Sequence, residues 1–172
     1  MILKDALIFL NNSFLFLQKK IHSIYLNSTI YNKKISLTDS GFLEYRPSSS
    51  LLDCLIKYDK KKINIENYSL KEIWNNKNLK KKDYKNLNSF FWLFSLDLKS
   101  SKKDTQNVIL QWIENNHKYN SKSWEINIVA KRLIAWISNS KLTYEDGDLI
   151  YKEKFNNIIK KQINHLINEI EK

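Results

Sequence analysis

The sequence is poor in the residues that shape tight turns and cross-links. Its 172 residues include two glycines, one proline and one cysteine. Turns between strands usually need Gly, Asn-Gly or Pro, so this scarcity favours helices joined by polar loops. The single Cys54 excludes a disulfide within the chain, and a lone thiol among apolar neighbours is typical of a buried side chain. The composition therefore predicts an all-α protein.

The chain is long enough for one hydrophobic core. Of its 172 residues, 42% are hydrophobic and 13% are aromatic, which argues against disorder. We expect an N-terminal helix and an irregular connection over residues 1–60, followed by a helical domain over residues 61–172.

Positive charge is supplied almost entirely by lysine, and the formal net charge is +11. Clustered basic residues neutralise phosphates, but here the lysines are scattered along the chain. The densest runs, residues 60–62 and 80–82, each adjoin an aspartate, as is typical of solvated loops. Nucleic acid is therefore not the partner we expect, and a basic nucleic-acid-binding domain is kept as an alternative.

The first 26 residues are apolar, with polar interruptions. The interrupting residues are Lys4, Asp5, Asn11 and Asn12. A spanning helix needs roughly 20 nearly uninterrupted apolar residues, and a signal peptide ends at a small-residue cleavage site, so neither pattern is met. We expect no transmembrane segment, a cytoplasmic location, and a helix at residues 3–26 that packs on its own domain or a partner. A position on a membrane surface, with Lys19 and Lys20 at the headgroups, is the alternative.

Apolar residues recur at helical spacing through much of the remaining sequence. The periodicity predicts helices at residues 50–58, 83–98, 103–116, 123–138 and 149–171. In the helix expected at residues 83–98, apolar residues from Tyr84 to Leu98 fit one buried face. Before it, Ser69 and Glu72 have the spacing of a capping box, which indicates the start of a further helix after Ser69. Residues 27–50 lack the period, so we expect an irregular connection with a short strand at Ile35. The apolar side of the last helix still runs as the sequence ends, so we expect it to need a partner and the frame to be truncated.

The stretch SWEINIVAKRLIAWI, residues 123–137, holds Trp124, Trp136 and Arg132, one of only two arginines. A guanidinium is planar, stacks on rings and binds a carboxylate through two bonds, which lysine does not do. At about 100° per residue, Arg132 falls at the rim of a core face that includes Ile126 and Trp136. In one interpretation Arg132 stacks on Trp136 and pairs with an acid. In the other, Arg132 and Trp124 face a cleft that binds an anionic, ring-bearing ligand such as an acidic sugar.

The order of rings around this stretch resembles that of a known family. The series comprises Phe90, Phe91, Trp92 and Leu93, then Trp112 and Ile113, then Trp124, Ala130, Arg132, Leu133, Ile134 and Trp136, and finally Tyr151, Phe155, Gln162, Ile163 and Leu166. Over residues 40–172 this series resembles the N-terminal helical domain of heparinase II/III-like proteins, a group of polysaccharide lyases.

The resemblance implies a partial α/α toroid of antiparallel helices with an irregular N-terminal segment. It also implies β-elimination of uronic-acid-containing polysaccharides, in which a base removes the C5 proton and the 4-linked sugar leaves. The family residues that perform this chemistry lie beyond the matched region, so we expect no catalytic residue here and no activity of this chain alone. Expected partners are an acidic polysaccharide, bound by the full-length protein, and the missing half of the toroid with its β-domain.

The residues expected to line one wall of a sugar-binding cleft are Trp92, Trp124, Arg132 and Trp136. We expect no cofactor. The histidines, His22, His117 and His165, lie in unrelated segments without metal-ligand spacing, so we expect no metal and place each at the surface, His165 on the polar side of the last helix. The alternative function from another class is a non-catalytic helical interaction module.

Overall fold

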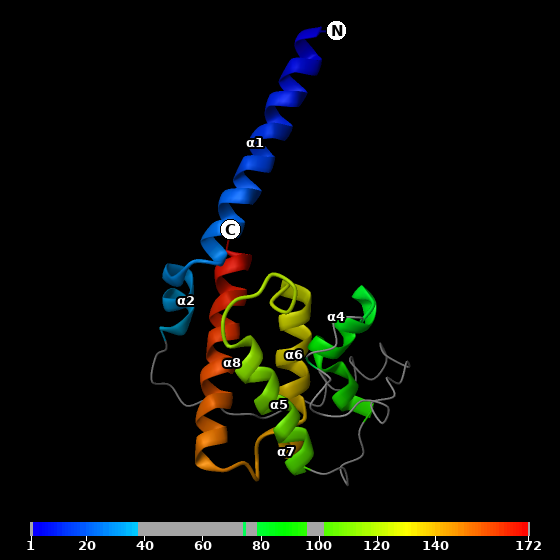
Figure 1. Ribbon diagram of the computed structural model, residues 1–172, viewed down its shortest axis with the longest axis vertical. Coiled ribbons are helices and arrows are strands. Elements are labelled where there is room, and N and C mark those ends of the chain that lie inside the picture. Colours follow the sequence, from blue (N-terminus) through cyan, green and yellow to red (C-terminus); the bar gives the residue numbers. More distant parts are fainter. Residues whose placement is uncertain (1, 38–73, 75–78, 96–101, 172) are drawn as a thin grey trace.

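The computed structural model describes residues 2–37, 74, 79–95 and 102–171, and these residues contain helices but no strands (Figure 1). The elements are α1 (Ile2–Leu26), α2 (Thr29–Ser36), α4 (Lys81–Ser89), the 3-10 helix η1 (Phe91–Ser95), α5 (Lys102–Asn116), α6 (Ile126–Ser138), α7 (Ser140–Thr143) and α8 (Leu149–Ile170). Over the described residues the expected all-α class is confirmed. The helices expected at residues 50–58 and after Ser69, and the domain boundary expected at residue 60, lie outside them.

Helices α5, α6 and α8 surround the core. Contacts between α6 and α8 run in opposite order along the two helices: Arg132 meets Gln162, and Trp136, further along α6, meets the earlier Phe155. This order makes α6 antiparallel to α8, as the colours in Figure 1 show. The expected helices at residues 103–116 and 149–171 are confirmed to within one residue at each end. On α5 the predicted apolar side is buried, namely Val108, Ile109, Trp112 and Ile113.

Residues 29–36 form helix α2, so the irregular connection with a strand at Ile35 is wrong for this segment. Ser28 is the N-cap, and its side chain accepts a hydrogen bond of 3.1 Å from the backbone N–H of Tyr31. Tyr31 and Ile35 lie one turn apart and are fully buried where α2 packs on α8. An isolated helix of 8 residues is unstable in water, so packing on α8 decides its structure. Residues 38–50 lie outside the described part.

The continuous helix expected at residues 83–98 is also wrong. Helix α4 ends at Ser89, its C-cap residue Phe90 has a φ of 55° in the left-handed region, and η1 follows. Phe90, Phe91, Trp92 and Leu93 are all buried, although they are consecutive. One side of a helix cannot bury four consecutive residues, so the change of direction at Phe90 is what lets each of them reach the core.

The apolar side of α8 is covered by α2, α5 and α6 within the chain. Its buried residues include Tyr151, Phe155, Ile158 and Ile159. The expectation that this side needs an outside partner is therefore wrong over most of its length. Large apolar side chains of α8 are exposed at its two ends, namely Leu149 and Ile150 at the start and Ile167 and Ile170 near the C-terminal end.

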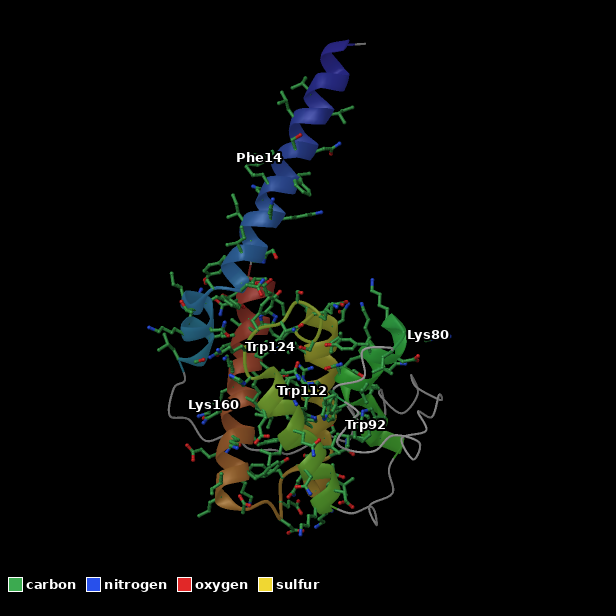
Figure 2. All side chains as sticks on the ribbon, viewed as in Figure 1. Phe14, Lys80, Trp92, Trp112, Trp124 and Lys160 are labelled. Atoms are coloured by element: carbon green, nitrogen blue, oxygen red, sulfur yellow. The ribbon has the colours of Figure 1, made fainter. Side chains whose placement is uncertain are left out.

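Helix α1 projects away from the other described helices, which we call the body (Figure 1). The expected helix at residues 3–26 is confirmed, but its packing is confined to its last turns. Leu26 is buried, the Tyr25 and Tyr31 rings lie 5.1 Å apart, and His22 Nε2 lies 3.0 Å from Glu169 Oε2. Further from the body the described side chains are exposed, among them Phe14 (Figure 2). In the described part of the chain, no helix combines the length and apolarity that crossing a bilayer requires.

Candidate binding pocket

The four residues predicted to line a sugar-binding wall, Trp92, Trp124, Arg132 and Trp136, lie inside the body. None exposes more than 6% of its surface, and Figure 2 shows Trp92 and Trp124 among the packed side chains around Trp112. The helix expected to begin at Ser123 begins at Ile126, so Trp124 lies in the turn before α6. Ile126, expected in the core, is 40% exposed instead.

Arg132 is fully buried, not at the rim of α6 as predicted. Its guanidinium carbon lies 3.9 Å from the centre of the Trp112 ring and 6.0 Å from that of Trp136, so the main stacking partner is Trp112. Its Nε donates to Gln162 Oε1 at 2.7 Å, and its Nη1 donates to the carbonyls of Asn88 and Ser123 at 2.8 and 3.0 Å. The acidic partner that we expected is replaced, among the described residues, by an amide and two carbonyls.

The charge of Arg132 is therefore stabilised by dipoles and by a ring face. Burial lowers the pKa of its guanidinium, and the nearby Tyr84 phenol opposes this shift. An arginine keeps its proton in proteins nevertheless, because its ordinary pKa is so high. Nη2 has no hydrogen-bond partner among the described residues. Arg132 thus ties α4, α6 and α8 together at one buried point.

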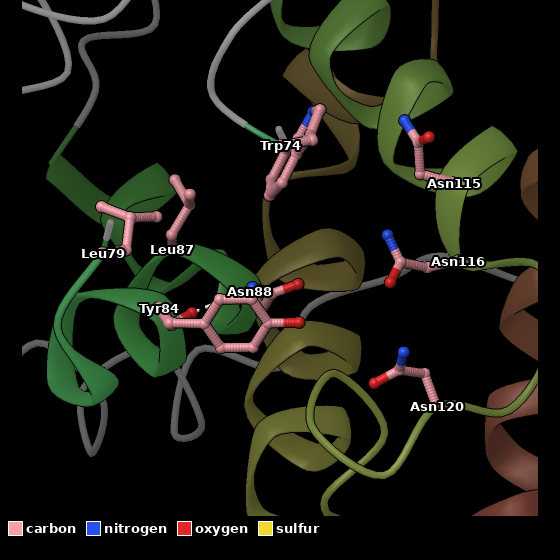
Figure 3. Close-up of a pocket in the computed structure, with 8 residues that line it drawn as sticks. All are labelled: Trp74, Leu79, Tyr84, Leu87, Asn88, Asn115, Asn116 and Asn120. Carbon is pink, nitrogen blue, oxygen red and sulfur yellow. Dashed lines mark hydrogen bonds between the residues drawn. The ribbon is translucent and has the colours of Figure 1, made fainter. Parts of the chain in front are cut away.

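A pocket of about 260 Å³ opens beside this point, between α4 and the end of α5. Its lining residues are Trp74, Leu79, Tyr84, Leu87, Asn88, Asn115, Asn116 and Asn120. In Figure 3, Asn115, Asn116 and Asn120 form one side, Tyr84, Leu79 and Leu87 the opposite side, and Trp74 one end. Rings and amides thus face each other across the pocket.

Three of the four residues predicted to line a sugar-binding wall donate hydrogen bonds to backbone carbonyls of the pocket's lining residues. Trp124 donates through Nε1 to the carbonyl of Asn116 at 3.1 Å and through its backbone N–H to that of Asn120 at 2.8 Å. Arg132 holds the carbonyl of Asn88, and Trp92 Nε1 donates to that of Leu87 at 3.3 Å. Of the predicted four, Trp92, Trp124 and Arg132 therefore contact the pocket's lining. Trp136 packs instead on the rings of Phe90, Trp112 and Phe155.

The asparagines keep hydrogen-bonding capacity for a ligand. Asn115 and Asn116 donate through Nδ2 to the carbonyls of Gln111 and Trp112, four residues back, at 2.8 and 3.1 Å. Their Oδ1 atoms accept no hydrogen bond from the described residues. Burial raises the pKa of Tyr84, and Ser123 and Arg132 partly oppose this shift, so the phenol keeps its proton at neutral pH. Among the described lining residues the Tyr84 phenol is the one titratable group, and the rings and amides around it suit the binding of a polar ligand.

The histidines are placed differently from one another. His165 is buried, so its expected place on the polar side of the last helix is wrong. Its Nε2 lies 3.0 Å from the carbonyl of Trp124, and its Nδ1 lies 2.6 Å from the Tyr31 hydroxyl. A carbonyl only accepts, so Nε2 carries the hydrogen and Nδ1 accepts from Tyr31. His117 is exposed as expected. In the described part of the chain, no group of His, Cys, Asp and Glu residues is placed to hold a metal.

Sequence reasoning missed every residue that lines the pocket. Asparagine and lysine are frequent throughout this chain, so Asn115, Asn116 and Asn120 carry no distinguishing local signal. The burial of His165 did have a signal, because it lies three residues beyond Gln162 and seven beyond Ile158, both buried on α8. Comparisons of the chain with known protein families, curated proteins and solved structures gave no match.

Proposed function

We propose that this chain is the N-terminal helical part of a heparinase II/III-like polysaccharide lyase and that its pocket holds one sugar unit of an acidic glycan. The observation that carries the proposal is the pocket itself. Trp74 and Tyr84 line it together with three asparagines of the opposite side. Three of the residues in the family-like series, Trp92, Trp124 and Arg132, hold that lining in place.

The lining suits a sugar ring for chemical reasons. Aromatic side chains offer an apolar surface to the C–H faces of a ring, while amides both donate to and accept from hydroxyl groups. A volume of about 260 Å³ is slightly below the usual range of ligand pockets, which fits a single ring better than a larger ligand. The net charge of +11 attracts an anionic polymer to the surface from a distance.

Catalysis belongs, in this proposal, to the half of the toroid outside this chain. Proton abstraction from a uronate needs a base, an acid and a group that stabilises the developing anion. Apart from the Tyr84 phenol, whose pKa is raised by burial, the described lining offers none of the usual acids or bases. This chain would therefore contribute one wall of the substrate-binding cleft and no reacting group.

The binding test compares matched asparagine substitutions. Asn115→Ala/Asn116→Ala removes two pocket amides from α5, and Asn168→Ala removes an amide that makes the same hydrogen bond, four residues back, on α8. We expect the double variant to bind heparan sulfate or alginate oligosaccharides at least about tenfold more weakly in calorimetric titration. Asn168→Ala should bind like the wild type. Equal affinity of all three proteins, or no binding by any, would contradict the pocket assignment.

Two further measurements separate the alternatives. Incubation of the chain with the same polysaccharides should produce no absorbance of unsaturated uronate, and robust turnover would overturn the claim that catalysis lies elsewhere. Tight duplex DNA binding that falls steeply with added salt, and that Asn115→Ala/Asn116→Ala leaves unchanged, would favour the nucleic-acid alternative instead.

A further inference from the structure

Helix α1 carries an uninterrupted line of exposed apolar side chains, which we call the seam. Its members are Leu7, Leu10, Phe14, Leu17, Ile21 and Ile24. They are spaced alternately three and four residues apart, and each exposes between 55% and 65% of its surface. This alternation is the a/d pattern of a coiled coil, in which two such seams pack knobs into holes.

The body does not cover this seam. Contacts of α1 with the rest of the described chain are made by its last turns, at His22, Tyr25 and Leu26. The remainder of the helix projects freely, as Figure 1 shows, so another helix has room to lie along it. The structure thus presents a helix-binding surface with nothing in the described residues to fill it.

The seam is complementary to itself. In a parallel pairing, the flanking positions bring Ser13 opposite Gln18 and Lys20 opposite Tyr25 of the second copy, so no like charges meet. In an antiparallel pairing the spacing is symmetric, and Leu7 faces Ile24 while Phe14 faces Leu17. A surface that matches a copy of itself is what a two-fold dimer requires.

The length of α1 is sufficient for a reversible dimer. Its 25 residues extend for roughly 37 Å. Two paired seams of about three heptads bury on the order of 1,000 Å² in total, which is at the lower end of specific interfaces. An association that depends on protein concentration is therefore expected.

We propose that α1 is a dimerisation helix and that its seam packs against the α1 seam of a second copy of this chain. A lipid surface fits the observations less well. A helix lying on a membrane keeps one side polar, but Ile8 and Phe16, on the side of α1 opposite the seam, are 52% and 68% exposed. These two residues also supply a matched control.

The test uses the full chain and two double variants, each of which replaces two exposed apolar side chains with asparagine. Leu10→Asn/Leu17→Asn changes the seam, and Ile8→Asn/Phe16→Asn changes the opposite side. Sedimentation velocity over a concentration series should show a monomer–dimer equilibrium for the wild type. The seam variant should raise the dissociation constant of the dimer at least about 100-fold, and the dissociation constant of the control variant should stay within about threefold of the wild-type value. Circular dichroism and thermal melting should show that both variants are folded, because the substituted side chains do not contact the body.

Several results would overturn the proposal. A wild-type chain that stays monomeric at high micromolar concentration would exclude dimerisation. Equal weakening by both variants would indicate non-specific apolar association. Binding of a monomeric chain to phosphatidylserine-containing vesicles, lost in both variants, would assign α1 to a lipid surface.

Discussion

The contacts of Arg132 explain why this chain, whose positive charge is almost entirely lysine, has an arginine at this position. The planar guanidinium stacks on Trp112 while its donors reach Gln162 Oε1 and two backbone carbonyls in different directions. A lysine ammonium could neither stack in this way nor span those acceptors at once. A buried cation is costly to desolvate, so the contacts must be retained as a set.

Replacement of Arg132 should therefore be among the most damaging changes in the body. We expect Arg132→Ala to lower the free energy of unfolding by about 3–5 kcal/mol, because it leaves a cavity beside Trp112 and buried acceptors without donors. Arg132→Lys should lose roughly half as much, since the charge remains but the stack does not. Urea denaturation measures both losses. A lysine variant as stable as the wild type would show that planarity is unimportant here.

Tyr31 links α2 to α8 through His165, and its ionisation predicts a loss of stability at high pH. Burial, followed by the negative charge of Glu169, raises the pKa of Tyr31, and burial also raises those of Tyr84 and Tyr119. Unfolded tyrosines ionise near pH 10.0, whereas these keep their protons longer in the folded state. The unfolded state therefore binds fewer protons above that pH, and the free energy of unfolding falls as pH rises.

Tyr31→Phe isolates this contribution. At neutral pH the variant should be less stable by roughly 1–2 kcal/mol, because His165 Nδ1 loses its donor in the core. The difference between the two proteins should then narrow above pH 10.0, since only the wild type has Tyr31 to ionise on unfolding. Urea denaturation at a series of pH values gives the comparison. A constant difference across that range would contradict the assigned cause.

At the scale of helices, the reliable predictions were the ones with a long amphipathic period. α5 and α8 bury residues at i, i+3, i+4 and i+7, a pattern that local sequence contains in full. The local sequence contains no such complete pattern for α2 or for the break at Phe90. In both cases the backbone is decided by what the side chains pack against, because Tyr31 needs α8 and Phe90 needs Trp112 and Trp136.

The start of α8 offers a test of local capping. Asp148 is its N-cap and accepts a hydrogen bond of 2.7 Å from the backbone N–H of Tyr151. Asp148→Ala should lower the free energy of unfolding by about 1 kcal/mol, whereas Asp148→Asn should cost only a few tenths, because asparagine caps equally well. Thermal unfolding of both variants and the wild type measures these two losses of free energy. Equal losses would mean that the charge at the helix N-terminus, and not the cap, is what stabilises α8.

At the scale of the whole molecule, the described residues form a packed body and one projecting helix. The hydrophobic core runs from Leu26 through α2 to α8, so residues 26–36 belong energetically with the helices that follow. Most of α1 contributes no buried surface to that core. The stability of the body and the proposed self-association of α1 should therefore be separable.

Two truncations test this separation. Removal of residues 1–20 should leave the melting temperature of the body within about 2 °C of the full chain, because the described side chains of this segment are exposed. Removal of residues 1–28 also deletes Leu26 and the Ser28 cap, and should lower the melting temperature by roughly 5 °C or more. Calorimetry gives both values. A shorter truncation that destabilises as much as the longer one would show that α1 supports the body.

The helical class and the bounds of α5 and α8 could be predicted from the residues alone, because an apolar period of 3.6 residues is a local property. The groups that cover Arg132 and His165, and the asparagines that face Trp74 and Tyr84 across a pocket, are brought together by the tertiary fold. The reason is distance along the chain. Arg132 is bound by Gln162, 30 residues away, and His165 by Tyr31, 134 residues away, so no local window contains the groups that cover them.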